Sequence, residues 1–179
     1  MNKKWECYEV DESKVQELAK KYNLDELLAR ILVNKGITEK EAIELFINPT
    51  RRDFHNPFLM PDMIAAVNRI LRAIKEKERI IIYGDYDADG ITSTTVLKKY
   101  LEERGLEVFS YIPNRIDEGY GLNKEAIQKI YDEGYRLMIT VDCGISGNEE
   151  IEFANSLGIG TIITDHHEPA DTLPNAMAV

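Results

Sequence analysis

The chain has 179 residues and a formal net charge of −10, from 22 Lys and Arg and 32 Asp and Glu side chains. Its 44% hydrophobic and 30% charged residues exclude a chain that is disordered throughout, and no run approaches the about 18 consecutive apolar residues of a membrane span. The first residues lack the apolar stretch of a signal peptide, and two distant cysteines exclude a disulfide framework and a CxxC zinc site, so we expect a cytoplasmic protein.

Residues 1–78 have a helical pattern. Asp11 is placed to cap a first helix, and the pairs Asn23–Glu26 and Thr38–Glu41 have the spacing of capping boxes at the start of two more. A connector with three prolines follows, and apolar residues at helical spacing between 64 and 74 predict a further helix. We therefore predict a helical lead-in over residues 1–78.

From residue 79, short apolar runs alternate with helical segments. The runs cover residues 79–83, 107–112, 137–141 and 159–164, and the helical segments cover roughly 92–104, 124–133 and 147–157. Asn123 is placed to cap the second helical segment, and Ser146 with Glu149 has capping-box spacing at the third. This alternation predicts an α/β domain over 79–179, with a mainly parallel βαβ sheet flanked by helices.

The negative charge lies in this second part. Residues 1–78 hold 14 basic and 14 acidic side chains, whereas residues 79–179 hold 8 and 18. A solvated acidic surface is one interpretation, and it argues against a broad nucleic-acid-binding surface. The other is that carboxylates are gathered to hold divalent cations, which neutralise them.

Residues that can bind metals follow three of the predicted strands, where parallel sheets bind their ligands. The segments are GDYDADG (84–90), DCG (142–144) and DHHE (165–168), with the candidate ligands Asp85, Asp87, Asp89, Asp142, Asp165 and His166. Carboxylate and imidazole donors suit Mn²⁺ and, with more water, Mg²⁺. Two such ions activate a water and stabilise the leaving oxygen of a phosphoester, and a nearby imidazole orients phosphate or assists proton transfer. The residues therefore indicate metal-assisted phosphoester hydrolysis.

Other interpretations of single motifs remain open. An EF-hand loop needs Glu at its twelfth position, where this chain has Val96. The motif of haloacid-dehalogenase-type phosphatases would leave Asp142 and the His pair without a role. His166 and His167 can also simply end a strand, and Cys143 is interpreted as a small buried residue. In the glycine-containing loop after the second strand, the guanidinium of Arg115 has a geometry suited to phosphate.

Four motifs, in this order, resemble those of the DHH phosphoesterase superfamily, and within it the bacterial exonucleases specific for single-stranded DNA. The motifs are GDYDADG with Ile91-Thr92-Ser93, NRIDEGYGLN (114–123), TVDCG (140–144) and TDHHEP (164–169). The lead-in, with Asn48-Pro49 and His55–Phe58, is also similar, so the resemblance covers nearly the whole chain. The Tyr-Asp-Ala-Asp-Gly form resembles the exonuclease branch, since relatives that act on short nucleotides typically have a His-led first motif.

The resemblance implies roles for nine residues of the motifs. Asp87, Asp89, Asp142 and His166 are the implied metal ligands; Asp85, Asp165 and His167 are the implied catalytic group; Arg115 and Asn114 are the implied phosphate contacts. In that group, Asp85 lies in or beside the ligand shell, Asp165 supports the His pair, and His167 faces the scissile phosphate or a metal. The implied cofactor is Mn²⁺ or Mg²⁺, with two ions in the complete enzyme.

The implied activity is 5′-to-3′ removal of nucleotides from single-stranded DNA in repair and recombination. The implied partners are a single strand with a 5′ end, a helicase and a single-strand-binding protein, and no membrane. The family is much longer than this chain and continues with a further metal-binding Asp, a second catalytic lobe and a DNA-binding module. We therefore expect an N-terminal fragment whose DHH domain is incomplete and which has little or no nuclease activity alone.

Two alternatives to this function are kept. One is another DHH phosphoesterase, acting on short oligonucleotides or cyclic dinucleotides. The other is a non-catalytic scaffold with this fold, like the superfamily's relative in eukaryotic replicative helicases. The intact set of Asp and His residues argues against a scaffold, which has no need to keep every ligand.

Overall fold

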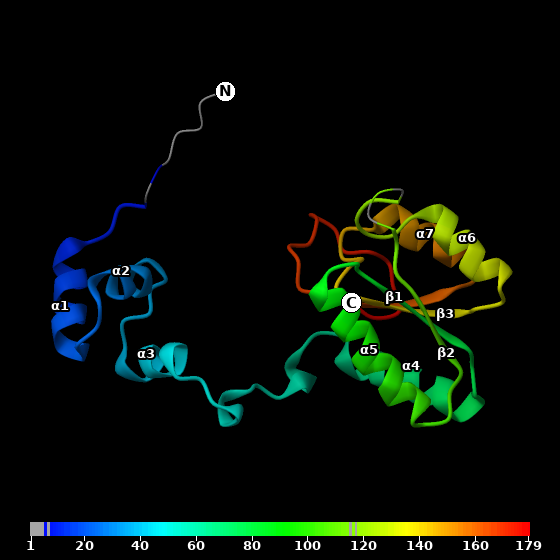
Figure 1. Cartoon of the computed structure of the whole chain (residues 1–179), viewed down its shortest axis with the longest axis horizontal. Coiled ribbons are helices and arrows are strands. Elements are labelled where there is room, and N and C mark those ends of the chain that lie inside the picture. The colour runs from blue at the N-terminus through cyan, green and yellow to red at the C-terminus, as the bar shows by residue number, and fades with distance from the viewer. Residues whose placement is uncertain (1–5, 7, 115, 117) are drawn as a thin grey trace. The chain divides into compact units, whose positions relative to one another are not determined.

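The structure, a computed structural model, describes all residues except 1–5, 7, 115 and 117. Its contacts divide the chain into two compact units, Met1–Asn56 and Pro57–Val179, each described by itself (Figure 1). In the part of the chain that the structure covers, every helix is too short or too polar to cross a membrane.

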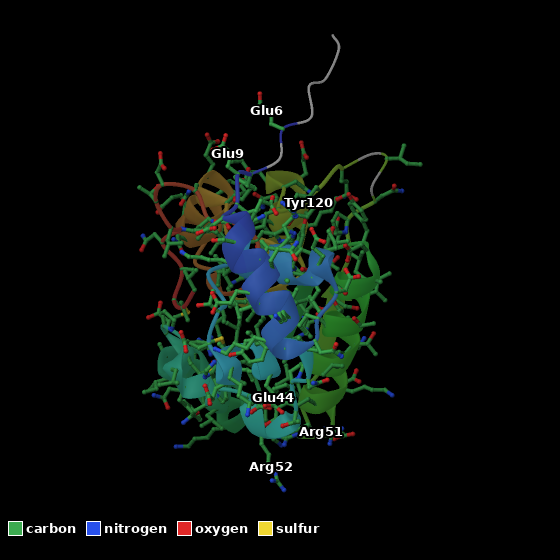
Figure 2. All side chains as sticks on the ribbon, turned by 90° about the vertical axis from the view of Figure 1, so that its left-hand side faces the viewer. Glu6, Glu9, Glu44, Arg51, Arg52 and Tyr120 are labelled. Atoms are coloured by element: carbon green, nitrogen blue, oxygen red, sulfur yellow. The ribbon has the colours of Figure 1, made fainter. Side chains whose placement is uncertain are left out.

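The first unit is helical, as predicted. It contains α1 (Glu12–Tyr22), α2 (Glu26–Asn34), α3 (Lys40–Ile47) and the single 3-10 turn η1 (Arg51–Asp53). Its core consists of the buried apolar side chains Val15, Leu18, Ala29, Leu32 and Ile43. The exposed side chains of η1, Arg51 and Arg52, are labelled in Figure 2.

Only one of the three predicted caps in this unit is present. Asp11 caps α1, accepting hydrogen bonds from the N–H groups of Ser13 and Lys14. Asn23 instead ends α1 in the left-handed conformation (φ +51°), and Asp25 caps α2 through Leu27 N–H. The predicted capping box at Thr38–Glu41 is also wrong, because the residue at the N-cap of α3 is Glu39.

The second unit is a four-stranded parallel sheet between helices, which confirms the predicted fold class. Its helices are the 3-10 turn η2 (Pro57–Leu59), α4 (Met63–Glu76), α5 (Ala88–Glu102), α6 (Lys124–Asp132) and α7 (Asn148–Ser156). Its strands are β1 (Ile80–Gly84), β2 (Val108–Tyr111), β3 (Leu137–Val141) and β4 (Gly160–Thr164). In Figure 1, α4 and α5 lie on one side of the sheet, and α6 and α7 lie on the other.

Alternate residues of β1, β3 and β4 lie in two separate cores, one on each face of the sheet. On β1, Ile80 and Ile82 pack with Ala73 of α4 and Leu101 of α5. Ile81 and Tyr83 belong to the opposite core, with α6 and α7. Burying an aliphatic side chain of this size stabilises a fold by about 1.5–3 kcal/mol. A sheet that is buried on both faces explains why the strands read as continuous apolar runs.

The division between the units differs from the boundary that we predict after residue 78. The structure places it between Asn56 and Pro57, so α4 belongs with the sheet. Ala73 of α4 is fully buried in the sheet core, and Ile70 and Ile74 pack against that core. The apolar face of α4 is therefore part of the second unit, although its sequence pattern resembles that of the helices before it.

The strand order β2-β1-β3-β4 has its switch point between β1 and β3, because the chain leaves β1 for one neighbour and then returns to the other side. Open parallel sheets bind ligands at the carboxyl ends of strands at such a point. Gly84 pairs with Val141, and Val141 pairs with Thr164. The next residue of each strand is an aspartate, so Asp85, Asp142 and Asp165 leave the sheet side by side.

Candidate metal centre

Helix α5 begins inside the acidic motif that follows β1. Asp87 is its N-cap, with Oδ1 accepting hydrogen bonds from the backbone N–H groups of Asp89 (2.9 Å) and Gly90 (3.1 Å). These bonds, led by the one from Gly90, hold the pKa of Asp87 below its usual value. The predicted start of this helix near residue 92 is wrong, because the motif itself supplies the cap and first turn. Asp89 therefore lies in the first turn of α5.

Two glycines let β1 and α5 approach each other closely. A Cβ on Gly84 would lie 2.1 Å from Thr94 Oγ1, and a Cβ on Gly90 would lie 2.4 Å from the backbone oxygen of Asp85. Both distances are far inside van der Waals contact, so any side chain here would force α5 away from the strand. The glycines of GDYDADG thus hold Asp85 and Asp87 in their relative positions.

Asp85 is buried with one oxygen unsatisfied. Its exposed fraction is 4%, and Oδ1 has no hydrogen-bond partner among the described residues. A buried carboxylate oxygen without a donor is unfavourable, unless a cation or donor outside the chain satisfies it. Asp85 belongs to a group in which one carboxylate oxygen each from Asp85, Asp87 and Asp142 lie within 4.8 Å of one another. This donor set fits Mg²⁺ or Mn²⁺.

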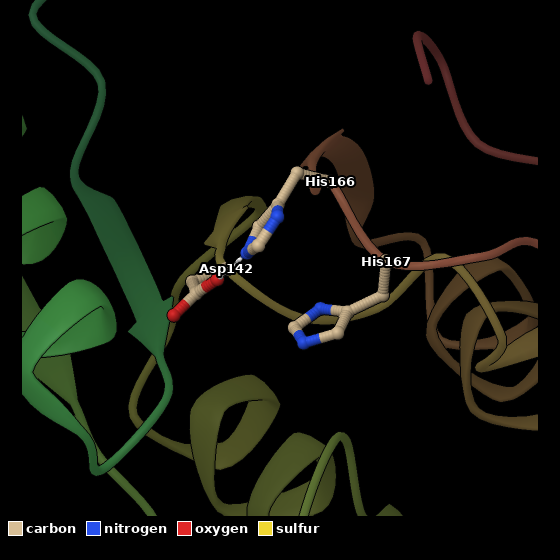
Figure 3. A group of neighbouring side chains, drawn as sticks. All are labelled: Asp142, His166 and His167. Atoms are coloured by element: carbon tan, nitrogen blue, oxygen red, sulfur yellow. Dashed lines mark ion pairs between the residues drawn. The ribbon is translucent and has the colours of Figure 1, made fainter. Parts of the chain in front are cut away.

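Asp142 stands at the centre of the site. It has a φ of +63°, which is uncommon for a residue with a side chain, and it is 7% exposed. Burial and, next, the charge of Asp87 raise its pKa, while His166 acts in the opposite direction. His166 Nε2 lies 3.0 Å from Asp142 Oδ1 (Figure 3). A carboxylate held in a strained conformation next to other carboxylates is typical of a functional site.

The residues after β4 form a tightly bonded turn. Asp165 Oδ1 accepts hydrogen bonds from the backbone N–H groups of His166 (2.8 Å) and His167 (3.1 Å), and its Oδ2 accepts one from Ile145 N–H (3.0 Å). His167 Nδ1 lies 2.7 Å from the same Oδ1. Burial alone would raise the pKa of Asp165, but these bonds hold it below its usual value.

The two histidines and Asp142 make a second possible ligand group. One atom of each lies within 4.8 Å of the others, and the two rings face the same space (Figure 3). Asp142 therefore belongs to both groups. Asp89 is outside both groups. It borders a hollow of about 360 Å³ between α5 and the ends of β3 and β4, which Asp142 and His166 also line.

The loop between β2 and α6 reaches the same edge of the sheet. Its candidate phosphate ligand Arg115 lies outside the described residues. Asn114 is exposed, and its side-chain oxygen accepts a hydrogen bond from Ile116 N–H (2.9 Å), which closes a local turn. Asn123 caps α6 through Ala126 N–H, as predicted, whereas the predicted capping box at Ser146 is absent because Gly147 is the N-cap of α7.

Two residues of this loop were not assigned a role from the sequence. Glu118 accepts hydrogen bonds from Tyr111 OH, from Asn123 Nδ2 (3.1 Å) and from Asn114 N–H (3.0 Å). Tyr120 places its hydroxyl 3.1 Å from His167 Nδ1. The signal for both was their position in a motif at the ligand-binding edge, but spacing alone does not reveal their contacts.

Cys143 is a core residue in the structure, as we interpreted it. It is fully buried, and burial raises its pKa to about 12. Tyr83 is also buried, with its hydroxyl donating to Gly121 O (3.0 Å). Both side chains lie in the core next to the site and are not exposed in it.

Comparison with known proteins gives one family. The family model described as "DHH family, N-terminal domain" matches residues 79–179. The single-stranded-DNA-specific exonuclease RecJ of Bacillus subtilis is 43% identical over 176 residues, which are 98% of this chain and 22% of that protein. The RecJ of Escherichia coli is 37% identical over 160 residues, 87% of this chain and 26% of that protein. The chain thus spans about a quarter of the length of these relatives.

Solved structures give the same likeness. An exonuclease RecJ bound to manganese has a TM-score of 0.63 and 36% identity, covering 70% of this chain and 32% of that one. The RecJ of Thermus thermophilus in complex with Mn²⁺ has a TM-score of 0.60 and 27% identity, covering 93% of this chain and 23% of that one.

Proposed function

The chain belongs to the DHH family, and on that premise we propose that it carries the metal-binding half of the active site of a single-stranded-DNA-specific exonuclease. The observation that carries the proposal is the meeting of the buried Asp85 and Asp142 with Asp87 at the switch point of the sheet. The names of the relatives supply the substrate class, since each is an exonuclease specific for single-stranded DNA.

Mn²⁺ or Mg²⁺ is the proposed cofactor, because the donors are carboxylates and imidazoles and the related structures hold manganese. Asp87, Asp89, Asp142 and His166 are the proposed ligands, with Asp85 completing the carboxylate group. Membership of Asp142 in both ligand groups supports two neighbouring ions. When bound, such ions lower the pKa of a water and stabilise the leaving oxygen of a phosphodiester.

The residues round the centre orient the reaction. Asp165 is acceptor-only when ionised, so the proton on His167 Nδ1 points to Asp165, and Nε2 is the nitrogen proposed to face the scissile phosphate or a metal. Asn114 and Arg115 are proposed to contact the phosphate from the loop after β2.

Further parts of the proposal rest on the relatives alone. We infer 5′-to-3′ digestion from a 5′ end, a role in DNA repair and recombination, cytoplasmic location, and a helicase and a single-strand-binding protein as partners. Because the relatives are about four times longer, the nuclease activity is proposed for a protein of their length, and this chain alone is expected to have little or none.

Calorimetric titration of the chain with Mn²⁺ tests the proposal. We expect binding by the unaltered chain and none by Asp142→Ala. Asp171→Ala is the matched control, because Asp171 is an exposed carboxylate close in sequence to the His pair but outside both ligand groups. A chain that is folded by circular dichroism and binds no Mn²⁺ would overturn the metal centre.

The substrate is tested in a protein of the relatives' length that carries these residues. A ladder of products from a long 5′-phosphorylated single strand is expected, with Asp142→Ala abolishing it. Hydrolysis of dinucleotides alone would contradict the exonuclease and indicate a phosphoesterase of short nucleotides.

A further inference from the structure

A second hollow, of about 320 Å³, borders the candidate metal centre at His167. It lies among the loop before α6, the turn after β3 and the start of α7, and we call it the Tyr120 hollow. Its lining includes Tyr120, Leu122, Ile145, Gly147, Glu150 and His167. Of the candidate ligands, only Asp165 and His167 border it. The hollow is thus a neighbour of the metal centre rather than a part of it.

The charge of the described residues that line the hollow disfavours phosphate as the occupant. Glu150 and Asp165 both line the hollow, and none of the described Lys and Arg side chains does. A dianionic phosphate group would be repelled by both carboxylates. The group that fits is neutral, and it can be partly apolar because Leu122 and Ile145 line the same space.

An aromatic ring forms one wall. Tyr120, labelled in Figure 2, is 54% exposed and meets the ring of His167 edge to face, with 5.7 Å between centroids. Its position is held by its own loop, because Tyr83 OH donates to Gly121 O and Asn123 bonds both Tyr83 and Glu118. A half-exposed ring that is fixed in advance is the usual platform on which nucleic-acid bases stack.

Gly147 and Glu150, at the start of α7, form another wall of the hollow. Gly147, the N-cap of α7, makes no side-chain cap bond, so the first N–H groups of that helix lack a capping side chain among the described residues. Glu149 is occupied by Lys124 (2.9 Å), whereas Glu150 faces the hollow. Base edges carry donors and acceptors together. A Cβ on Gly147 would lie 3.1 Å from Leu122 Cδ1, so glycine keeps this wall open.

We propose that the Tyr120 hollow is a subsite for the base of one nucleotide, with Tyr120 as the stacking surface and Glu150 accepting from an exocyclic amino group. The inference rests on the proposed function, since the phosphate of that nucleotide would lie at the metal centre on the other side of His167. The subsite would contact the base, whereas the metal centre would contact only the sugar-phosphate backbone. The residues that line the subsite are unsuited to a second phosphate.

The test compares two probes on the chain with Mn²⁺ present: deoxyadenosine 5′-monophosphate and deoxyribose 5-phosphate, which lacks the base. Tyr120→Leu is expected to weaken the binding of deoxyadenosine 5′-monophosphate by about 5- to 150-fold, the value of one stacked base. The binding of deoxyribose 5-phosphate is expected to stay unchanged. Tyr120→Phe keeps the ring and is expected to keep the affinity. Tyr100→Leu is the matched control, because Tyr100 is a similarly exposed tyrosine on α5 that does not line the hollow.

The outcomes separate this inference from the proposed function. Normal Mn²⁺ binding with equal affinity for the two probes, or with equal weakening of both by Tyr120→Leu, overturns the base subsite and leaves the metal centre standing. Absence of Mn²⁺ binding overturns the proposed function itself. Glu150→Gln is expected to weaken the binding of the adenine nucleotide but not that of the thymine nucleotide, which has no exocyclic amino group. Equal effects on the binding of both nucleotides would contradict the role of Glu150.

Discussion

His167 Nδ1 lies 2.7 Å from Asp165 Oδ1, and the side chain of Asp165 is only 1% exposed. An ionised carboxylate accepts hydrogen bonds and cannot donate, so Nδ1 carries the proton of this hydrogen bond and Nε2 is the nitrogen that does not contact Asp165. Tyr120 OH approaches the same Nδ1 at 3.1 Å. One buried carboxylate therefore determines which nitrogen of the exposed ring is presented to the metal centre.

Asp165→Asn is expected to release the His167 ring. The hydrogen bond to Asp165 is the main cause of the raised pKa of His167, so the substitution should lower that pKa toward about 6.5. Nitrogen-15 NMR of the metal-free chain, which has only three histidines, reports both the pKa and the protonated nitrogen. A raised folded pKa stabilises the fold most below the unfolded pKa, and this contribution is lost as pH rises through the folded value. The substitution should therefore destabilise more below the unfolded pKa of about 6.5 than above the raised folded pKa. An unchanged His167 titration would contradict this account.

Asp142→Asn is expected to stabilise the metal-free chain while abolishing Mn²⁺ binding. Burial and the charge of Asp87 raise the pKa of Asp142, so its ionised form is less favourable in the fold than in the unfolded chain. Asparagine removes the charge and tolerates the φ of +63°. We expect a gain of about 0.5–2 kcal/mol at neutral pH in urea unfolding.

The pH dependence supplies the control for that prediction. A carboxyl group with a raised folded pKa loses stabilisation as pH rises from its unfolded value through its folded value. The gain from Asp142→Asn should therefore shrink as the pH is lowered through the raised folded pKa of Asp142, and it should be gone below about 4, the unfolded value. A gain that is the same at all pH values would show that backbone strain, and not charge, is the cause.

The sheet and its functional edge were predictable because they depend on patterns that tertiary contacts do not override. Buried parallel strands need apolar runs, and the four runs lie within two residues of the strands observed. Their carboxyl ends must share an edge, so the aspartates after β1, β3 and β4 converge there. The sequence could not indicate that α4 packs on this sheet, because the spacing of apolar residues in a helix does not specify which element they pack against.

Caps show where local patterns fail. Asn123 and Asn23 both stand just before acidic residues at a plausible helix start, yet Asn123 caps α6 and Asn23 ends α1. Asparagine suits both the N-cap and the left-handed conformation, so its type does not distinguish the two ends of a helix. The late start that we predict for α5 has the same origin: we interpret Asp87 only as a ligand, although aspartate is also a strong N-cap.

Gly90→Ala is expected to destabilise the fold although alanine favours helix by about 1 kcal/mol. The new Cβ would lie 2.4 Å from the backbone oxygen of Asp85, and overpacking of this kind costs about 1–3 kcal/mol or more. Gly105→Ala is the control: Gly105 has a φ of +80° but no atom within 4 Å of a Cβ, so only the conformational cost of about 1 kcal/mol applies. Thermal unfolding should rank Gly90→Ala as the more harmful change, and Mn²⁺ binding should weaken only in that variant.

Glu78→Gln is expected to loosen the attachment of α4 to β1. Glu78 accepts two hydrogen bonds from the guanidinium of Arg69, at 2.6 and 3.2 Å, and the Arg69 side chain is 10% exposed. That hydrogen-bonded pair is the main reason that the pKa of Glu78 lies below its usual value. Hydrogen bonds to charged groups contribute about 1.5–3 kcal/mol, so we expect a loss of this order at neutral pH.

The pH profile identifies the ion pair as the cause. A lowered folded pKa gives stabilisation that is present above the unfolded pKa, about 4.3, and is lost as pH falls through the folded value. The difference in unfolding free energy between the chain and Glu78→Gln should be constant above that pH and shrink below it. Glu102→Gln removes an exposed pair with Lys98 on α5 and should cost less than about 0.5 kcal/mol. Equal losses in the two variants would mean that the partial burial of Arg69 adds nothing to its pairing with Glu78.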